Sequence, residues 1–321
     1  MSDLAGHEAA WRAWRSAMGS ARMHHAWILA GPKGVGKGLF ARAAAAELVA
    51  EAGIPQPPAD RHPDILIPEH PPENKDEAKK REDGGDYRRK RSIPIDEIRT
   101  VQHRLNTRPT LGSRRVVIID PADDLEKNAS NALLKSLEEP PAGTYFLLVT
   151  HKPGRLLPTI RSRCRVLRFD PVADATIDAV LRAEAPQADA AARSAAIAAA
   201  EGSPGAALNF VEQDLGRLHQ LMLRLIREGD DHFELRGALA AEIGARPDRE
   251  RQQAAVDLAR AVVAAELAHG GPARQGRVID VHGELVRLAG QLPTYNFDPA
   301  LVVMEIGALL ASLAMPREAA S

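Results

Sequence analysis

The sequence predicts an α/β fold built on a mostly parallel sheet, followed by a C-terminal part made only of helices. Two observations carry this prediction. In the first half of the chain, apolar runs of strand length alternate with segments of helical periodicity, an order typical of a parallel sheet covered by helices. After Asp170 the chain becomes rich in alanine and leucine at helical spacing, and it contains no convincing strand.

The strands and helices expected in the first half follow one another in a regular order. The expected helices cover residues 1–20, 37–50, 95–105, 129–138 and 156–161. The expected strands cover residues 25–30, 64–67, 115–120, 145–150 and 165–169. Because each strand is followed by a helix or a long connection, neighbouring strands are expected to run parallel.

Changes in composition divide the chain into three expected domains. The α/β domain covers residues 1–170 and includes a stretch at 69–92 that is dense in both charge signs. This stretch predicts a solvated insertion, with disorder as an open alternative. Residues 171–212 contain breaks typical of three short helices, and residues 213–321 carry longer helical patterns.

The whole-chain composition excludes several classes of protein. The 42 lysines and arginines nearly balance the 43 acidic residues, so a strongly basic nucleic-acid binder is excluded. Aromatic residues make up only 4% of the chain, which disfavours stacking platforms for single-stranded nucleic acid. Cys164 is the single cysteine, so no internal disulfide can form. Without a long apolar run or a signal peptide, we expect a cytoplasmic protein that does not enter a membrane.

A glycine-rich loop over residues 31–38 provides the first functional signal. It reads Gly-Pro-Lys-Gly-Val-Gly-Lys-Gly, which matches a phosphate-binding P-loop except at its last position. Gly31, Gly34, Gly36 and Lys37 are the candidate nucleotide-binding residues, since they lie between an expected strand and an expected helix. Gly38 replaces the serine or threonine whose hydroxyl coordinates Mg²⁺. A tight glycine turn in an unrelated α/β protein is the alternative interpretation.

Asp120 is a further candidate residue of the degenerate nucleotide site, because it ends the apolar run of residues 116–119. In P-loop ATPases an acid at this place helps to hold Mg²⁺, and an adjoining glutamate polarises the attacking water. Here Pro121 follows, and proline has no group that orients water. Asp123 and Asp124 are close in sequence, but helix geometry is expected to carry them away from the site. Taken alone, Asp120 is better explained as a helix start, because an aspartate followed by proline at the end of a strand commonly begins a helix.

Two other runs resemble a known family. Residues 131–141 read Asn-Ala-Leu-Leu-Lys-Ser-Leu-Glu-Glu-Pro-Pro, and residues 158–164 read Pro-Thr-Ile-Arg-Ser-Arg-Cys. Both runs resemble the bacterial clamp-loader subunits of DNA polymerase III, which are AAA+ proteins. The resemblance is strong over residues 20–210. It implies an AAA+ P-loop domain, a small helical lid domain and an all-α collar domain that holds the subunits together.

The resemblance gives roles to individual residues. In this family the arginine of Ser-Arg-Cys reaches the nucleotide of a neighbouring subunit, which makes Arg163 a candidate arginine finger acting in trans. Arg163 in a plain basic surface turn is the alternative. Thr150 matches a polar residue that senses the nucleotide. Gly205 stands where ATP-binding relatives carry a lid arginine, so this contact to the nucleotide is also missing.

The same resemblance implies partners and excludes a metal. Many relatives carry four cysteines as a zinc module before a His-Pro-Asp sequence. This chain keeps the sequence at residues 62–64 without any cysteine near it, and His62 alone cannot form a four-ligand zinc site. We therefore expect no metal and no required cofactor, with weak residual ATP binding left open. The implied partners are the clamp-loader ATPase subunits and the delta subunit, and through the assembly the sliding clamp and primer-template DNA.

These observations lead to a main hypothesis and an alternative. The main hypothesis is a non-hydrolysing clamp-loader subunit, part of the DNA polymerase holoenzyme, that supplies Arg163 to a neighbour. The alternative is an active AAA+ ATPase subunit in which Lys37 and Asp120 suffice to hold nucleotide. Strong DNA binding by the chain alone is disfavoured by its neutral net charge.

Overall fold

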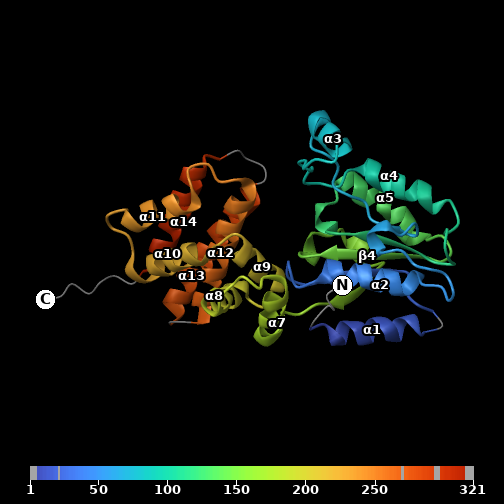
Figure 1. Cartoon of the computed structure of the whole chain (residues 1–321), viewed down its shortest axis with the longest axis horizontal. Coiled ribbons are helices and arrows are strands. Elements are labelled where there is room, and N and C mark those ends of the chain that lie inside the picture. The colour runs from blue at the N-terminus through green and yellow to red at the C-terminus, as the bar shows by residue number, and fades with distance from the viewer. Residues whose placement is uncertain (1–5, 21, 269–270, 293–296, 315–321) are drawn as a thin grey trace. The chain divides into compact units, whose positions relative to one another are not determined.

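The structure is a computed structural model that describes residues 6–20, 22–268, 271–292 and 297–314. The chain forms two compact units that meet in sequence between Val172 and Ala173. The first unit is an α/β domain and the second consists of helices (Figure 1). Each unit is described by itself below.

The centre of the first unit is a five-stranded sheet with the strand order β2-β3-β4-β1-β5. Every neighbouring pair of strands is parallel. The strands are β1 (Ala26–Ala30), β2 (Ile65–Leu66), β3 (Arg115–Ile119), β4 (Thr144–Thr150) and β5 (Arg165–Arg168). Since all strands point the same way, the loops that follow β1, β3 and β4 meet at one edge of the sheet.

Helices cover both faces of this sheet (Figure 1). Alternate residues of β1 enter different cores: Trp27 and Leu29 pack with α1 and α2, whereas Ile28 packs with α4 and α5. The helices of this unit are α1 (Glu8–Met18), α2 (Lys37–Val49), α3 (Lys75–Glu82), α4 (Ile95–Leu105), α5 (Lys127–Glu138) and α6 (Pro158–Arg161). Short 3-10 helices lie at Ala59–Arg61, Ala122–Asp124 and Pro153–Arg155. The predicted parallel α/β fold is therefore confirmed, with most element ends within two residues of the expectation.

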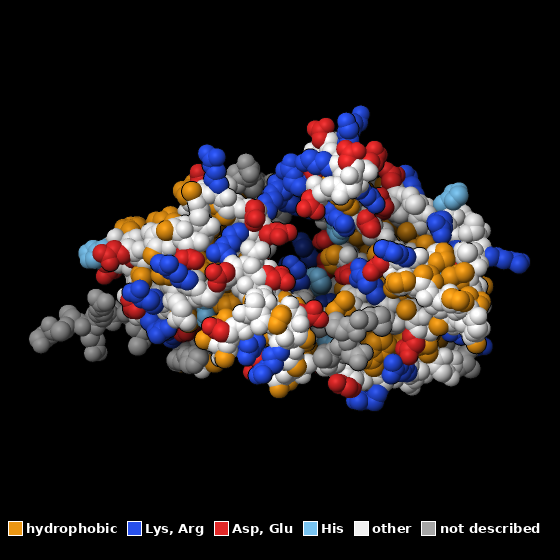
Figure 2. Space-filling model, in the orientation of Figure 1, with side chains coloured by type: hydrophobic (Ala, Val, Ile, Leu, Met, Phe, Trp, Pro, Cys, Tyr) orange, Lys and Arg blue, Asp and Glu red, His pale blue; other side chains and the backbone are white. Residues whose placement is uncertain are grey.

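The charged segment of residues 69–92 has more regular structure than its composition suggested. It contains α3, and Figure 2 shows acidic and basic side chains mixed over this part of the surface. The carboxylate of Glu77 is nearly buried and accepts hydrogen bonds from Lys80 Nζ at 2.8 Å and from the Arg88 backbone nitrogen at 2.7 Å. These hydrogen bonds lower the pKa of Glu77 to about 2. Disorder is thus the wrong alternative for this segment, because its charges bind one another.

A fully buried ion pair fixes the edge of the sheet. Arg115, the first residue of β3, places Nη2 3.3 Å from Asp64 Oδ1, and both side chains are almost completely buried. The Asp64 carboxylate also accepts hydrogen bonds from the backbone nitrogens of Thr110 and Leu111, each at 2.7 Å. The guanidinium group of Arg115 donates in addition to three backbone carbonyls. The carboxylate of Asp64 and both terminal nitrogens of Arg115 thus have partners, whereas Arg115 Nε has none in the described structure. Removing either member of the pair would leave the other charge buried and unpaired.

The second unit consists of helices that share an apolar core. They are α7 (Asp174–Glu184), α8 (Ala190–Ala200), α9 (Pro204–Glu212), α10 (Gly216–Glu228), α11 (Glu234–Ile243), α12 (Arg249–Ala265), α13 (Pro272–Gln291) and α14 (Pro299–Ala311). The three short helices expected within residues 174–212 are present as α7, α8 and α9. All eight helices belong to one compact unit, and the division into a lid (171–212) and a collar (213–321) stays a prediction. Across the described ranges, no helix combines the length and apolarity needed to cross a membrane.

Candidate functional site

The P-loop connects β1 to α2, and its glycines are required by its backbone. A Cβ atom at Gly31 would lie 2.2 Å from the carbonyl oxygen of Phe169, so no other residue fits there. Gly34 and Gly36 adopt φ angles of 80° and 103°, in the left-handed region that favours glycine. The loop therefore keeps the backbone shape of a phosphate-binding turn that leads into the N-terminus of α2.

Lys37, the first residue of α2, is turned onto its own loop. Its Nζ donates to the carbonyl oxygens of Gly31 at 2.7 Å and Pro32 at 2.5 Å, and the residue is only 2% exposed. Burial lowers the pKa of Lys37 to about 8, although the nearby carboxylates of Asp120 and Asp123 oppose this shift. The ammonium group that would contact a phosphate is thus held by two carbonyl groups of the loop.

Asp120 follows β3 and lies directly against Gly38. A Cβ atom at position 38 would lie 2.3 Å from Asp120 Oδ2, so the place of the missing serine or threonine side chain is taken by the Asp120 carboxylate. Arg42, one turn further along α2, places Nη1 3.3 Å from the same oxygen and 3.2 Å from the Gly38 carbonyl oxygen. The carboxylate is therefore neutralised by a protein cation.

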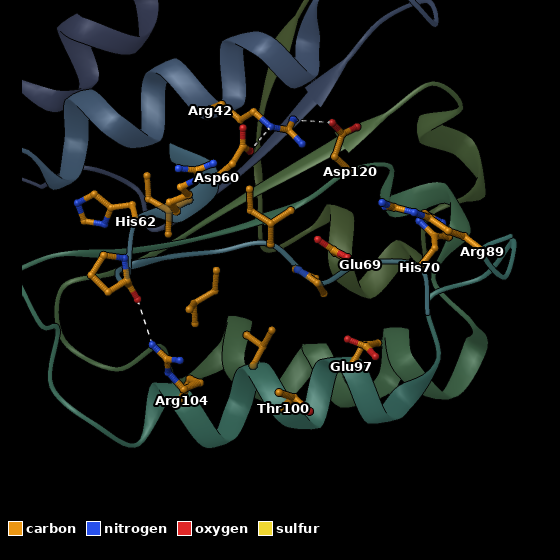
Figure 3. Close-up of a pocket in the computed structure, with 17 residues that line it drawn as sticks. Arg42, Asp60, His62, Glu69, His70, Arg89, Glu97, Thr100, Arg104 and Asp120 are labelled. Carbon is orange, nitrogen blue, oxygen red and sulfur yellow. Dashed lines mark hydrogen bonds and ion pairs between the residues drawn. The ribbon is translucent and has the colours of Figure 1, made fainter. Parts of the chain in front are cut away.

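A second carboxylate holds Arg42 from the other side. The Nε atom of Arg42 donates to Asp60 Oδ1 at 2.9 Å, so the guanidinium group lies between Asp60 and Asp120 (Figure 3). These three residues line one end of a cavity of about 470 Å³ beside β2 and α4. Four arginines and four carboxylates line this cavity, so its charge favours neither anions nor cations: Arg42, Arg61, Arg89, Arg104, Asp60, Glu69, Glu97 and Asp120.

Thr150, at the end of β4, hydrogen-bonds to Asp123, which was expected from the sequence to lie away from the site. Its Oγ1 donates to Asp123 Oδ1 at 2.6 Å, and the backbone nitrogen of His151 donates to Asp123 Oδ2, also at 2.6 Å. The prediction that helix geometry carries Asp123 away from the site is wrong. The residues after Pro121 form a single 3-10 turn, which brings Asp123 back to the end of β4.

His151 adds a titratable group to this edge of the sheet. Burial, and then the charge of Lys37, lower the pKa of His151, which favours the neutral imidazole. Its Nδ1 atom is buried without a hydrogen-bond partner in the described structure. Lys37, Asp120, Asp123, Thr150 and His151 thus gather where the loops after β1, β3 and β4 meet.

The residues present do not fit the Mg²⁺ ion of a P-loop ATPase. That ion needs a hydroxyl oxygen from position 38 and a carboxylate free to hold its water ligands. Gly38 offers no hydroxyl, and the Asp120 carboxylate is paired with Arg42. No group of three or more potential metal ligands occurs among the residues that the structure describes.

Arg163 lies in the turn between α6 and β5, at the protein surface. Its Nη2 atom is 2.7 Å from Glu138 Oε1, and its Nη1 atom donates to the Thr159 carbonyl oxygen at 2.9 Å and to Ser162 Oγ at 3.4 Å. The side chain keeps 35% of its surface exposed. The guanidinium group is therefore oriented by nearby groups and still accessible to a partner.

The rest of the Ser-Arg-Cys sequence holds this turn in place. Cys164 packs against the core formed by α4, α5 and α6. Burial raises the pKa of Cys164 to about 12, so its sulfur stays a thiol and its role is packing. Ile160, which is fully buried, fixes the preceding helix.

The structure also shows the surroundings of His62 and Gly205, two positions singled out from the sequence. The Asp64 backbone nitrogen donates to His62 Nδ1 at 3.0 Å, so the proton of this imidazole is on Nε2, which lies 2.7 Å from Gln56 Oε1. Both ring nitrogens of His62 are thus occupied within the protein. Gly205 lies in the first turn of α9, in the helical unit.

Sequence reasoning missed Arg42 and wrongly excluded Asp123 from the site. Arg42 could have been found, because it lies four residues after Gly38 and therefore on the same face of α2. Asp123 carried no such signal, since its position depends on how the chain turns after Pro121. His151 was also missed, although it directly follows the predicted Thr150.

The fold and the site together define the class of protein. A parallel sheet with a P-loop after β1, an acid after β3 and a polar residue after β4, followed by a helical unit, is the AAA+ arrangement. A sequence model of the family described as DNA polymerase III, delta subunit, matches residues 6–173. The chain belongs to this family.

Individual relatives agree with the family. Over 162 residues the chain is 40% identical to DNA polymerase III subunit delta' of Pseudomonas aeruginosa, covering 47% of this chain and 44% of that protein. It is 34% identical over 207 residues to the subunit of the same name from Escherichia coli K12, covering 63% and 59%. The chain thus spans about half the length of these relatives. It is also 32% identical over 168 residues to DNA polymerase III subunit tau of Salmonella typhimurium, covering 51% and 24%.

A solved structure supports the fold over nearly the whole chain. A DNA polymerase III gamma subunit-related protein from Thermotoga maritima superposes with a TM-score of 0.50 at 21% identity. The superposition covers 94% of this chain and 98% of that one. At this identity the likeness concerns the fold alone.

Proposed function

We propose that this chain is a cytoplasmic subunit of the DNA polymerase III clamp loader that does not hydrolyse ATP itself. It supplies Arg163 in trans to the nucleotide bound by a neighbouring ATPase subunit. Its partners are the ATPase subunits and the delta subunit, and the assembly places the sliding clamp on primer-template DNA. The family membership of the chain and its similarity to the tau subunit support this assignment.

The pairing of Asp120 with Arg42 carries the non-hydrolysing part of the proposal. Asp120 lies where the hydroxyl of residue 38 belongs, and its charge is already matched by a guanidinium group. Metal coordination and water activation each contribute orders of magnitude to phosphoryl transfer. With the place of the residue 38 side chain taken by Asp120 and Pro121 in place of a glutamate, the chain lacks both contributions. We propose that it needs no cofactor and that any ATP binding is weak.

The exposed arginine supports the part of the proposal that concerns a neighbour. An arginine finger stabilises the charge that develops on the transferring phosphoryl group, and it must reach that group from outside the nucleotide's own subunit. Arg163 is at the surface and retains N–H groups that its contacts with Glu138 and Thr159 do not use. Lys37 is turned inward and has no such freedom.

One helix of the second unit supports the proposed assembly. Gly276, Gly283 and Gly290 recur every seven residues on one face of α13, and a Cβ atom at any of them would meet open space. Ile279 and Val286 lie between them and are 59% and 40% exposed. A face of glycines and β-branched residues at heptad spacing allows close approach of another helix. This face suits the collar contacts that the proposal requires.

The test is reconstitution of the clamp loader with its ATPase subunits. Arg163→Ala should lower hydrolysis at the neighbouring site by about 10³-fold, and Lys37→Ala should leave the ATPase rate of the assembly unchanged. Arg161→Ala is the matched control, because Arg161 is an exposed arginine two residues away. A wild-type rate with Arg163→Ala would refute the finger, provided that gel filtration shows an intact assembly.

The second candidate function is an active ATPase subunit. Its support is that Lys37, Asp120 and Asp123 still lie close enough to interact at the edge of the sheet. Calorimetry of the isolated chain with ATP distinguishes the two functions. Micromolar, Mg²⁺-dependent binding with turnover that Lys37→Ala abolishes would establish this second function instead.

A further inference from the structure

Glu138 is the charged residue that meets the guanidinium group of Arg163. It is the last residue of α5, and its Oε1 atom lies 2.7 Å from Arg163 Nη2. The other two contacts of this guanidinium group, with Thr159 and Ser162, come from the same turn as Arg163. Glu138 is thus the contact that ties Arg163 to a different element of the fold.

We propose that Glu138 is a positioning residue that orients Arg163 toward the nucleotide of the neighbouring subunit. This inference rests on the proposed function. A free arginine side chain samples many rotamers, and an unoriented finger would lose that entropy each time the neighbour's nucleotide engaged it. An ion pair that fixes the direction of Arg163 beforehand removes part of that cost from the catalytic step.

Both partners of the pair are anchored on the core. Leu133 and Leu137 of α5 are buried, and so is Ile160 in the turn that carries Arg163. Packing of these side chains therefore sets the distance between the two backbones. A side chain that reaches from one anchored element to the other restricts the rotamers of its partner.

The position of Glu138 at the C-terminus of α5 also favours a positively charged partner. The C-terminus of a helix carries partial negative charge, which repels a carboxylate and favours a cation. A glutamate as the last residue of α5 is therefore unfavourable by itself, and the charge of Arg163 offsets this. Residues that oppose a local preference are frequently found at functional sites.

The exposed fractions limit how large the effect can be. Arg163 and Glu138 keep 35% and 49% of their side-chain surfaces exposed, so solvent screens the pair. Loss of such a pair should lower the turnover of the neighbouring ATPase about two- to fivefold. Loss of Arg163 itself should cost far more, because it removes the catalytic contact.

The experiment uses the reconstituted clamp loader and measures kcat and KM for ATP. Glu138→Gln keeps the shape of the side chain and removes its charge, and it should lower kcat with KM unchanged. Glu139→Gln is the matched control, since Glu139 is the exposed neighbouring glutamate and makes no ion pair in the described structure. Melting temperatures and gel filtration of each variant report folding and assembly.

The double variant separates positioning from a structural role. If Glu138 acts through Arg163, Glu138→Gln should have no further effect on hydrolysis in the Arg163→Ala background. A wild-type or increased kcat for Glu138→Gln would overturn the positioning role, while a strong effect of Arg163→Ala in the same assay would leave the finger intact. If Arg163→Ala also behaves as wild type, the proposed function fails as a whole.

Discussion

The P-loop and the Ser-Arg-Cys turn belong to the same α/β unit but hold their cations in opposite ways. At the P-loop, Lys37 is buried against two carbonyl groups and Asp120 is paired with Arg42, so the charged groups bind one another. At the turn, the Arg163 side chain keeps 35% of its surface exposed, although its guanidinium group contacts Glu138 and Thr159. The chain thus satisfies the charged groups of its P-loop region internally, whereas it leaves part of the Arg163 side chain accessible to another molecule.

The largest expected effect on the free energy of unfolding comes from the buried ion pair of Asp64 and Arg115, which lies in the same α/β unit as both regions. Asp64→Ala leaves the buried guanidinium group of Arg115 without its carboxylate and should lower the free energy of unfolding by about 3–5 kcal/mol. Urea unfolding of the isolated chain measures this change. Asp60→Ala is the control, because the Asp60 side chain is 68% exposed and its loss should cost less than about 1 kcal/mol. Equal losses for the two variants would contradict the prediction.

The next prediction concerns a serine at position 38, which would complete the P-loop pattern, and asks whether it restores ATP hydrolysis. In Gly38→Ser the new side chain meets Asp120 Oδ2, so Asp120 must move away from Arg42. We expect a loss of about 1–3 kcal/mol in the free energy of unfolding and no Mg²⁺-dependent ATP hydrolysis. Gly237→Ser is the matched control, since Gly237 is also helical and a Cβ atom added there would meet open space. ATP hydrolysis by the Gly38→Ser variant would contradict the prediction, because the site would then lack only the hydroxyl of residue 38.

The smallest effect concerns Lys37 and depends on pH. The pKa of Lys37 is about 8 in the folded chain, below its ordinary value of 10.5, so between these values the unfolded chain binds the additional proton. The free energy of unfolding contributed by this group therefore rises with pH across that window, by less than about 1 kcal/mol per pH unit. Urea unfolding of the wild type and Lys37→Met from pH 7 to 10.5 should show a difference that shifts in favour of the wild type. If the free energies of unfolding of the wild type and of Lys37→Met changed with pH in parallel, Lys37 would be solvated in the folded chain.

The sequence was sufficient to predict the positions of the strands in the sheet and of most of the helices. The apolar runs of β1, β3 and β4 are bounded by polar residues, and the periodicity of α4 places Ile98 and Val101 in the core, as expected. The glycines of the P-loop were likewise found from their spacing, because the backbone conformation demands them.

What the sequence could not show depends on contacts between distant residues. Arg42 and Asp120 are 78 positions apart, and only the fold brings them together. Arg115 was counted as the start of a strand, and its pairing with Asp64 was missed because charged residues are seldom fully buried. The helix α3 was missed for a similar reason, since the burial of Glu77 needs Arg88, eleven residues further on.

The charged segment of residues 69–92 has its two ends side by side. Glu73 donates its backbone N–H to the Arg88 carbonyl oxygen at 2.9 Å, and Lys90 donates to that of Pro71 at 2.7 Å. A segment that leaves and re-enters the fold at one point can be exchanged or lengthened at little entropic cost to the rest of the domain. It is therefore a suitable attachment point for a fluorophore or an affinity handle with which to follow this subunit in its assembly.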